Sequence, residues 1–178
     1  MHHTLHLDIQ EKIKAVHDRV AEGLSTHVPG ALVSSSIDYD YPVFVVAKES
    51  IHEVLTWLKT GDPGFTFLTT LCGVHFPDNK GQEFGMVYHL HNLEKNERIR
   101  IKLFTGSKEM DIPTATDLWP AANWMEREAY DFYGFRFVGH PDLRRILNMD
   151  EMNYFPLRKE YPLEDAGRAD KEDKFFGR

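Results

Sequence analysis

The sequence predicts an α+β fold: a mixed, largely antiparallel sheet with helices packed on it, plus an extended C-terminal tail. One observation is the order of patterns along the chain, which runs helix, strands, helix, strands, helix. A second is that three strand-like segments, 65–76, 84–93 and 98–105, follow one another with short connections, as in an antiparallel meander. We therefore expect a single domain over residues 1–163 and a separate tail over residues 164–178.

A first helix is predicted by apolar residues that recur in steps of four and three. These residues are Ile9, Ile13, Val16, Val20 and Leu24. Asp8 has a glutamate three residues later, as in a capping box, so we expect the helix to begin there and to stop before Pro29. An edge strand is then expected over 32–39 and a buried strand over 43–47, with a turn at 41–42 between them.

Two more helices are predicted from their boundary residues. Ser50 also has a glutamate three residues later, so a second capping box opens a helix that should end at Gly61. Pro120 suits the first position of a helix because its missing N–H would be unpaired there, and Gly134 suits the left-handed position just past the end. We therefore expect the third helix over 121–133.

The chain beyond the third helix is predicted to be mostly irregular. Residues 135–138 are typical of a short strand, and residues 139–141 are typical of a turn. Residues 142–147 either start a further turn of helix or run extended, and the sequence does not decide between the two. Residues 156–162 have proline at both ends, which disfavours a helix and predicts an extended path.

Composition excludes several classes of function. The chain has 178 residues, of which 42% are apolar and 28% are charged, as in an ordinary globular protein. A net charge of −7 argues against holding nucleic acid or an anionic lipid surface by bulk attraction. The single cysteine, Cys72, cannot form an intramolecular disulfide or hold an iron–sulfur cluster, and it is typical of a reducing compartment. No apolar run approaches the roughly 20 residues that span a bilayer, and no signal peptide is recognisable.

One stretch, 126–147, carries an unusual mixture of residues. It has the sequence EREAYDFYGFRFVGHPDLRRIL, in which eight of the 22 residues are Glu, Asp or Arg and five are aromatic. On the predicted helix Trp124, Glu128 and Asp131 share one face. Arg127 lies four residues before Asp131, so the two side chains can pair. The mixture suits neither a plain core element nor a plain solvated face.

The acidic and aromatic residues of this region each admit two interpretations. Glu126, Glu128 and Asp131 are either general acid/base groups or members of an ion network. The arginines available to that network are Arg127, Arg136, Arg144 and Arg145. We favour the network, because no nucleophile or substrate-positioning motif lies nearby. The aromatic residues form either an exposed patch for a partner or part of the core. They are Trp119, Trp124, Tyr130, Phe132 and Tyr133.

Three histidines form the other candidate site. His89 and His91 point to the same face of a predicted strand, and His75 lies on the preceding strand, an arrangement that zinc can use. The sequence shows no fourth ligand. Ordinary polar positions on the less buried face are therefore the favoured interpretation, and we expect no bound metal.

The 126–147 stretch resembles the signature of the C subunit (30-kDa-subunit family) of NADH:quinone oxidoreductase, respiratory complex I. The matching pattern is Glu126-Arg-Glu, Asp131 followed by two aromatic residues, His140, Arg144 and Ile146-Leu147. The flanking stretches 117–124 (DLWPAANW) and 156–163 (PLRKEYPL) resemble the lead-in and the exit of the same family. A looser resemblance extends upstream to Phe65, and nothing before about residue 60 is family-specific.

The resemblance implies a non-catalytic structural subunit in the peripheral, hydrophilic arm of a proton-pumping assembly. In that assembly electrons pass from NADH through FMN and iron–sulfur clusters in partner subunits to a quinone, and this chain carries no cofactor. Its partners would be other complex I subunits, chiefly subunits D and B, on the cytoplasmic side of the bacterial inner membrane, with membrane contact only through the complex. Interface or structural importance carries over to Glu126, Arg127, Glu128, Asp131, His140, Arg144, Arg145, Pro156, Leu157, Arg158 and Lys159.

Two alternatives are open at this point. The first is the equivalent subunit of a related membrane complex, either an energy-converting hydrogenase or the ferredoxin-driven photosynthetic complex, because the motif is shared across these. The second is an independent soluble enzyme that uses the acidic cluster.

The last segment, 164–178, has few apolar residues until Phe175-Phe176. It carries too little apolar surface to fold independently. We expect it to be extended, poorly packed on its own domain, and ordered against the D subunit or another neighbour, with the two phenylalanines as anchors.

Overall fold

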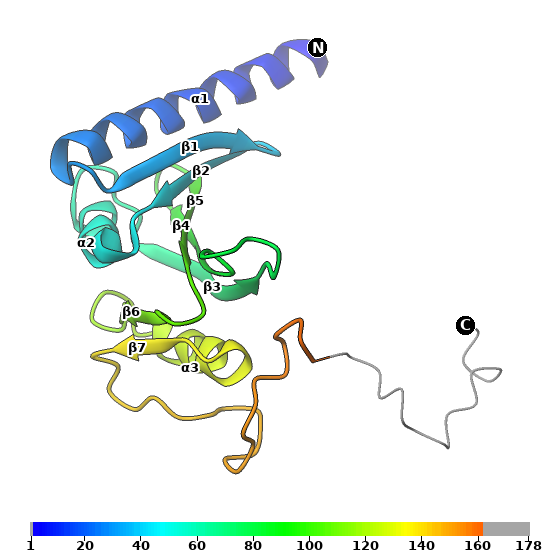
Figure 1. Cartoon of the computed structure of the whole chain (residues 1–178). Helices are drawn as coiled ribbons and strands as arrows, with labels where there is room; N and C mark the ends of the chain where they lie inside the picture. The colour runs from blue at the N-terminus through cyan, green and yellow to red at the C-terminus, as the bar shows by residue number, and fades with distance from the viewer. Residues whose placement is uncertain (1, 162–178) are drawn as a thin grey trace.

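This computed structural model describes the backbone of residues 2–161 and the side chains of residues 9–161. Its α-helices and β-strands, labelled in Figure 1, are α1 (His2–His27), β1 (Leu32–Asp38), β2 (Tyr41–Val46), α2 (Ile51–Thr60), β3 (Phe67–His75), β4 (Phe84–Asn92), β5 (Glu97–Thr105), β6 (Asp111–Pro113), α3 (Ala122–Tyr133) and β7 (Arg136–Val138). A 3₁₀ turn, η1 (Lys48–Ser50), precedes α2. Three α-helices and a five-stranded sheet confirm the predicted α+β class.

The main sheet has the strand order β1-β2-β5-β4-β3. Antiparallel pairing joins β1 to β2, β5 to β4 and β4 to β3, whereas β2 and β5 run parallel. The meander of β3, β4 and β5 is therefore as predicted, and the sheet is mixed but largely antiparallel. A second sheet pairs β6 with β7 in parallel. β6 lies outside every predicted strand, because three residues carry too little periodicity to predict one.

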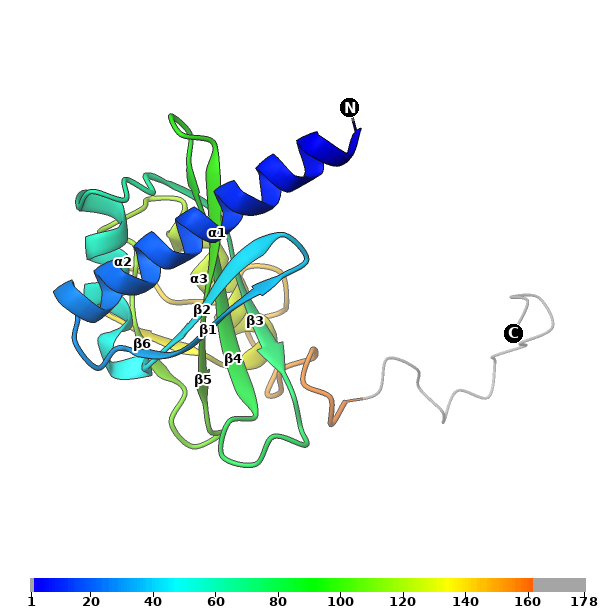
Figure 2. The ribbon, with the colours of Figure 1, turned by 90° about the horizontal axis from the view of Figure 1, so that it is seen from above.

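One face of the main sheet forms the core. Ile99, Ile101 and Leu103 alternate along β5, are fully buried, and belong to one hydrophobic cluster with residues of all three helices. The helices contribute Val16, Val20 and Leu24 from α1, Val54, Leu55 and Leu58 from α2, and Ala122 and Ala129 from α3. Figure 2 shows α1 lying across the strands, and α3 packs against β3.

The predicted start of the first helix is wrong. α1 begins at His2, so Asp8 lies inside the helix and does not cap it. Because residues 2–7 include neither Gly nor Pro, nothing in the sequence stops the helix from extending. The start of the second helix is right, but its capping box is not formed. Ser50 precedes α2 without a side-chain cap hydrogen bond, because the 3₁₀ turn Lys48–Ser50 already leads into the helix.

The predicted turn at 41–42 is also wrong, because both residues belong to β2. The turn is made by Tyr39 and Asp40, whose φ angles are 50° and 63°. Two successive positive φ angles are the requirement of a two-residue type I′ hairpin, which Asn and Gly usually supply. A Tyr-Asp pair gives no such signal, so the turn is displaced by two residues from its predicted place.

The third helix ends as predicted. Gly134 has a φ of 86°, and its N–H donates to the carbonyl of Tyr130 at 2.8 Å. After β7, residues 139–161 contain neither helix nor strand, and we call them the C-terminal segment. Residues 142–147 therefore form an irregular loop, which resolves the choice that the sequence left open.

The expected extended path of residues 156–162 is wrong over the part that the structure describes. The carbonyl of Phe155 accepts the N–H of Arg158 at 3.1 Å, and the carbonyl of Arg158 accepts the N–H of Tyr161 at 3.0 Å, which makes two successive turns. Pro156 occupies the second position of the first turn, where its fixed φ is favoured. A proline that disfavours a helix thus favours a turn here.

Residues 162–178 lie outside the described residues, so the expectations for the tail and for the domain boundary at 163 stay predictions. No helix within residues 2–161 combines the length and the hydropathy that crossing a bilayer requires.

Candidate functional site

Asp131, near the end of α3, is fully buried and accepts five hydrogen bonds. Three come from the backbone N–H groups of residues 146–148 at 2.8–3.1 Å, and two come from the side chains of Asn148 and Arg145. Burial alone would raise the pKa of Asp131, but the hydrogen bonds from residues 147–148 and from Arg145 outweigh burial and hold the pKa well below its ordinary range. This carboxylate therefore fixes the course of the loop that follows β7.

Arg145 is the ionic partner of Asp131 and is itself nearly buried. Its Nη1 lies 2.7 Å from Asp131 Oδ1, and its Nη2 donates to the carbonyls of Met152 at 2.7 Å and Tyr154 at 3.0 Å. The guanidinium also lies 5.2 Å from the centre of the Phe155 ring. A single side chain thus connects α3 to the middle and the end of the C-terminal segment.

The predicted pair of Arg127 and Asp131 is not formed. The Arg127 guanidinium donates to the carbonyls of Arg144 at 3.2 Å and Arg145 at 3.0 Å. Helical spacing allows the pair, but Asp131 points into the loop, whose own donors saturate it. Of the three residues on the predicted common face, Trp124 and Glu128 are exposed, whereas Asp131 is buried against the loop that donates to it.

Glu126, five residues earlier on α3, is also fully buried, and it faces a different neighbour. Its Oε1 accepts the N–H of Ala115 and its Oε2 accepts the hydroxyl of Thr114, both at 2.6 Å. Burial raises the pKa of Glu126 to about 7, although these two hydrogen bonds act in the opposite direction. Glu126 therefore ties α3 to the chain that leads out of β6, and it does so without an arginine.

The predicted ion network is wrong for most of its members. Glu128 is exposed and makes no hydrogen bond or ion pair with the described residues. Arg136 pairs with Asp111 at 2.6 Å, and Arg144 pairs with Asp142 at 2.9 Å, both at the surface. The three carboxylates of α3 thus lie in three separate environments, an arrangement that does not place two of them on one substrate.

His140 connects the start of the C-terminal segment to α3. Its Nε2 lies 3.1 Å from the carbonyl of Asn123, and its Nδ1 lies 3.0 Å from the backbone N of Asp142. The geometry requires a proton on Nε2, which donates, and a lone pair on Nδ1, which accepts. Both nitrogen atoms of the imidazole are therefore hydrogen-bonded to backbone groups.

Residues 156–159 fasten the end of the C-terminal segment to the domain. The N–H of Leu157 donates to Phe132 O at 3.2 Å, and the N–H of Lys159 donates to His75 Nδ1 at 2.9 Å. The Arg158 Nε donates to Tyr133 O at 2.8 Å. Its guanidinium lies over two aromatic rings, 5.0 Å from the centre of Phe84 and 4.6 Å from that of Phe155. Arg158 therefore connects the end of the segment to α3, as Arg145 connects its middle.

The aromatic residues divide between core and surface. Trp119 is buried, and its indole N–H donates to Thr66 O at 2.9 Å, whereas Trp124 is 59% exposed. Tyr130, Phe132 and Tyr133 are half-buried. The C-terminal segment itself exposes a further set of large apolar side chains, namely Leu147, Met149, Tyr154, Leu157 and Tyr161.

The three histidines are not brought together. His75 pairs across the hairpin with Phe84, at the opposite end of β4 from His89 and His91. His89 accepts a hydrogen bond from Arg100, and His91 lies 3.2 Å from Asn96 Oδ1. Over the described part of the chain, no three His, Cys, Asp or Glu side chains are grouped so that they could hold a metal ion.

Three residues of this site were missing from the sequence-based prediction. Thr114 holds Glu126, Asn148 supplies two of the five donors to Asp131, and the Phe155 ring contacts the guanidinium groups of two arginines. Phe155 was the one with a recognisable signal, because it is an aromatic residue directly before the exit stretch that begins at Pro156. The other two act through contacts that no spacing rule predicts.

Comparison with known proteins identifies the family. Residues 44–167 match the family described as the 30 Kd subunit of respiratory-chain NADH dehydrogenase. The chain belongs to this family. The match to the 30-kDa subunit family begins at residue 44, so the expectation that nothing before about residue 60 is family-specific is wrong.

Curated relatives agree with this assignment. The C subunit of the NADH-quinone oxidoreductase from Azorhizobium caulinodans is 41% identical over 152 residues, which cover 82% of this chain and 71% of the relative. That of Maricaulis maris is 37% identical over 171 residues, which cover 93% and 82%. The relatives of the 30-kDa subunit family thus match most of the chain.

Solved structures share the fold. A trypsin-resistant fragment of Nqo5, residues 1–134, superimposes with a TM-score of 0.61 and 29% identity, covering 70% of this chain and 99% of that one. A chain of the archaeal membrane-bound sulfane sulfur reductase superimposes with a TM-score of 0.68 and 24% identity, covering 82% and 85%. The second likeness shows the fold alone.

Proposed function

We propose that this chain is a non-catalytic structural subunit in the peripheral arm of a proton-pumping NADH:quinone oxidoreductase. In this proposal it lies on the cytoplasmic side of the bacterial inner membrane and supports the quinone-site subunits D and B. FMN and the iron–sulfur clusters belong to partner subunits. Membership of the 30-kDa subunit family and the names of the relatives support the assignment.

The observation that best supports the proposal is how the C-terminal segment is held in place while it exposes apolar side chains. It has no helix or strand, yet three largely buried side chains, Asp131, Arg145 and Arg158, take part in nine hydrogen bonds that hold it against α3 and against itself. At the same time Leu147 and Met149 are each 69% exposed. A segment held rigid while it exposes large apolar side chains is what a docking surface requires, because little conformational entropy is lost on binding.

A structural role also fits the chemistry of α3. Both buried carboxylates have their oxygen atoms occupied by donors from the chain itself, so neither is free to act on a substrate. The exposed Glu128 makes no hydrogen bond or ion pair with residues 9–161. The alternative that the chain is an independent soluble enzyme would be supported only if the isolated chain showed catalytic turnover and Glu128→Gln abolished it.

Purification of the intact assembly tests the proposal. The chain is tagged in its source organism, the membranes are solubilised in mild detergent, and the co-purifying proteins are identified by mass spectrometry. We expect subunits D and B together with the flavin- and NADH-binding subunits, and NADH-driven quinone reduction by the preparation. A tagged chain that purifies alone would contradict the proposal.

The same purification separates the proposal from its nearest alternative. The fold is shared with a chain of the membrane-bound sulfane sulfur reductase, so the fold does not distinguish NADH-linked complexes from other membrane complexes. Hydrogenase-type or ferredoxin-linked partners in place of the NADH-binding subunits would assign this chain to a related complex.

A further inference from the structure

The face of the main sheet opposite the core carries a row of basic residues. Arg98, Arg100 and Lys102 alternate along β5 with the buried Ile99 and Ile101, so their side chains point away from the core. β4 places His91 beside the first arginine and His89 beside the second. We call these five residues, Arg98, Arg100, Lys102, His89 and His91, the basic face.

The centre of the basic face is held in place. Arg100 Nε donates to His89 Nε2 at 3.0 Å, and its guanidinium lies 5.1 Å from the centre of the Tyr41 ring. Burial, with the charges of Arg100 and Lys102, lowers the pKa of His89, so this imidazole is neutral and free to accept. The arginine is thus oriented before any partner arrives, which reduces the entropy lost on binding.

The charge of the basic face is not neutralised by its own strands. The strands β2, β3 and β4 contain no Asp or Glu. The one acidic residue of β5, Glu97, pairs with Arg19 of α1. Arg98 and Lys102 form no ion pair with any residue in the described range. This concentration of positive charge stands out in a chain whose net charge is −7.

Acidic side chains lie at two borders of the basic face. β1 places Asp38 beside Tyr41 at one border. The carboxylate at the other border is Glu128 of α3, which lies near Cys72 of β3. Burial raises the pKa of the Cys72 thiol, the charge of Glu128 raises this pKa further, and the charge of Arg100 lowers it. Neither carboxylate pairs with a cation of the basic face within the described residues, so the cations stay available to a partner.

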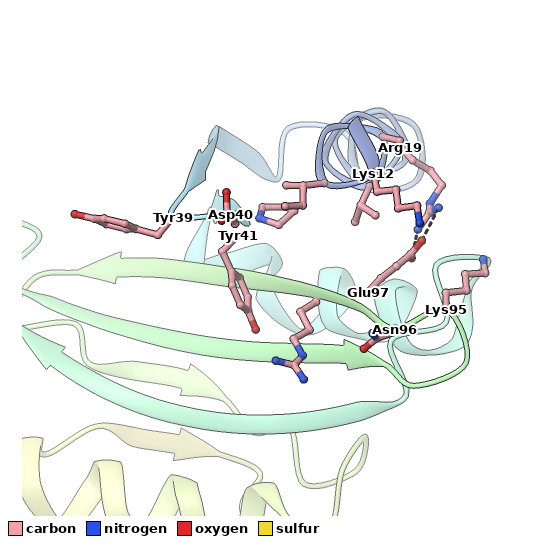
Figure 3. Close-up of a pocket in the computed structure, with 13 residues that line it drawn as sticks. Lys12, Arg19, Tyr39, Asp40, Tyr41, Lys95, Asn96 and Glu97 are labelled. Carbon is pink, nitrogen blue, oxygen red and sulfur yellow. Dashed lines mark hydrogen bonds and ion pairs between the residues drawn. The ribbon is translucent and has the colours of Figure 1, made fainter. Parts of the chain in front are cut away.

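A groove continues the basic face toward α1. It has a volume of about 720 Å³ and lies between α1, the β1–β2 turn and the β4–β5 turn. Arg98 and Tyr41 line it as well, and Lys12 and Lys95 add two further cations. Asp40 adds one carboxylate, which accepts a hydrogen bond from Gln10. Figure 3 shows Arg19 reaching from α1 to Glu97, with which it forms an ion pair. Lys12 and Lys95 take no part in this pair.

Exposed aromatic residues flank the basic face on the β3 side. Phe67, whose partner in β4 is His91, is half-exposed, and so is Phe76, which contacts Phe104 of β5. Arginine and aromatic residues together are what protein interfaces concentrate. A long polyanion such as nucleic acid, or an anionic membrane, would instead be repelled by the net negative charge of the whole chain.

We propose that the basic face and the adjoining groove dock an acidic segment of a neighbouring protein subunit. Its carboxylates would pair with Arg98, Lys102 and the groove lysines, and its apolar side chains would contact Phe67. This surface is distinct from the C-terminal segment, so the chain would bridge two neighbours. The proposal rests on the proposed function only in requiring that the chain works within an assembly.

Zero-length crosslinking of the intact assembly tests the contact directly. A carbodiimide joins a lysine amine to a carboxyl group only when the two touch. In the solubilised complex we expect Lys102, Lys95 or Lys12 to be joined to Asp or Glu of another subunit. The yield should fall when salt is raised to about 0.5 M, because the screening length then shrinks to about 4 Å.

Charge reversal supplies the second arm. Arg98→Glu/Lys102→Glu should lower retention of the chain in the complex by about tenfold at low salt. Lys80→Glu/Lys108→Glu, which changes the net charge equally at two exposed loop positions, should leave retention unchanged. Equal melting temperatures of the two variants, measured on the purified chains, show that both are folded.

The outcomes separate this proposal from the proposed function. If the wild-type chain does not enter a complex, the proposed function fails. If the wild type assembles, either of two results refutes the docking role of the basic face. One is that the Arg98→Glu/Lys102→Glu chain is retained in the complex at the wild-type level, and the other is that no crosslink to another subunit involves Lys102, Lys95 or Lys12. Release of the chain by nuclease, or binding to anionic vesicles that the reversal abolishes, would assign the face to a different partner and also refute the proposal.

Discussion

Two buried carboxylates on α3, five residues apart, are stabilised in opposite ways. Asp131 is surrounded by donors, so its ionised form is favoured and its pKa is held low. Glu126 has two donors and no cationic partner among residues 9–161, so burial dominates and its pKa rises to about 7. The same helix therefore presents a permanent anion to the C-terminal segment and a carboxyl group that changes charge near neutral pH to the β6 side.

Replacing Glu126 with Gln should remove a pH dependence of stability. In the unfolded chain a glutamate titrates near 4.5, and Glu126 titrates near 7 in the fold. Between these values the folded state binds more protons, so the free energy of unfolding falls as pH rises, by about 3 kcal/mol over the window at about 1.4 kcal/mol per pKa unit. Gln can donate to Thr114 and accept from Ala115, so the variant should fold.

Denaturant unfolding from pH 4.5 to pH 8 measures this prediction. Glu128→Gln, on the exposed side of the same helix, is the matched control and should keep the wild-type pH dependence. An unchanged pH dependence in Glu126→Gln would show that Glu126 is not the group responsible.

The neighbouring arginines Arg144 and Arg145 should differ sharply in their contribution to stability. Arg145→Ala leaves Asp131 buried without its cation, a loss of about 3–5 kcal/mol, whereas Arg144→Ala removes a surface pair and should cost no more than about 0.5 kcal/mol. The contribution of Asp131 is present above its ordinary pKa of 3.8 and is lost as pH falls below it, so the difference between the variants should shrink in acid.

Thermal unfolding of the two variants at pH 7 and pH 3 provides the measurement. Similar melting temperatures for Arg144→Ala and Arg145→Ala at pH 7 would contradict the role assigned to the buried pair.

At the scale of elements, the parts that follow periodicity were predictable and the parts that follow tertiary contacts were not. The β3–β5 meander and α3 have strong patterns and clear ends, and both are found where expected. The partner of Asp131 was mispredicted because helical spacing favours Arg127, while the donors that reach it come from residues 145–148, beyond β7. Spacing rules describe neighbours within an element and contain no information on a loop that folds back onto it.

The junction of α3 with the C-terminal segment should be sensitive to Gly134→Ala. Gly134 has a positive φ, and a Cβ there would lie 2.7 Å from both Arg158 Nη2 and the Phe155 ring. Gly81 has a similar φ of 83° but open space around it, so Gly81→Ala imposes the backbone strain alone, about 1–2 kcal/mol. Gly134→Ala should cost more than this and should loosen residues 155–161.

Limited proteolysis and thermal unfolding of the two glycine variants compare them directly. We expect faster cleavage within 155–161 in Gly134→Ala than in Gly81→Ala. Equal stability and equal cleavage would mean that the contact of Arg158 and Phe155 with the helix end does not hold the segment.

At the scale of the whole molecule, a compact α+β core supports two surfaces of different character. The C-terminal segment exposes apolar side chains on a backbone fixed by buried charges. On the side of the main sheet opposite the core, the basic face presents Arg98 and Lys102, which form no ion pair within residues 9–161. The proposed structural role has this requirement, because a structural subunit contributes to an assembly through the geometry of its contacts.

The most direct test of the structural role changes the C-terminal surface without changing the fold. Leu147→Gln/Met149→Gln replaces two side chains that are each 69% exposed, and Ile9→Gln/Val33→Gln is the matched control, since both of its residues are exposed and precede the family match. The measurement is NADH-driven quinone reduction by membranes carrying each variant, with complex assembly followed on native gels and the melting temperature of each purified chain. We predict unchanged melting temperatures, with assembly and activity lost in Leu147→Gln/Met149→Gln and kept in the control. Wild-type assembly and activity in Leu147→Gln/Met149→Gln would contradict the proposed role of the C-terminal segment as a docking surface.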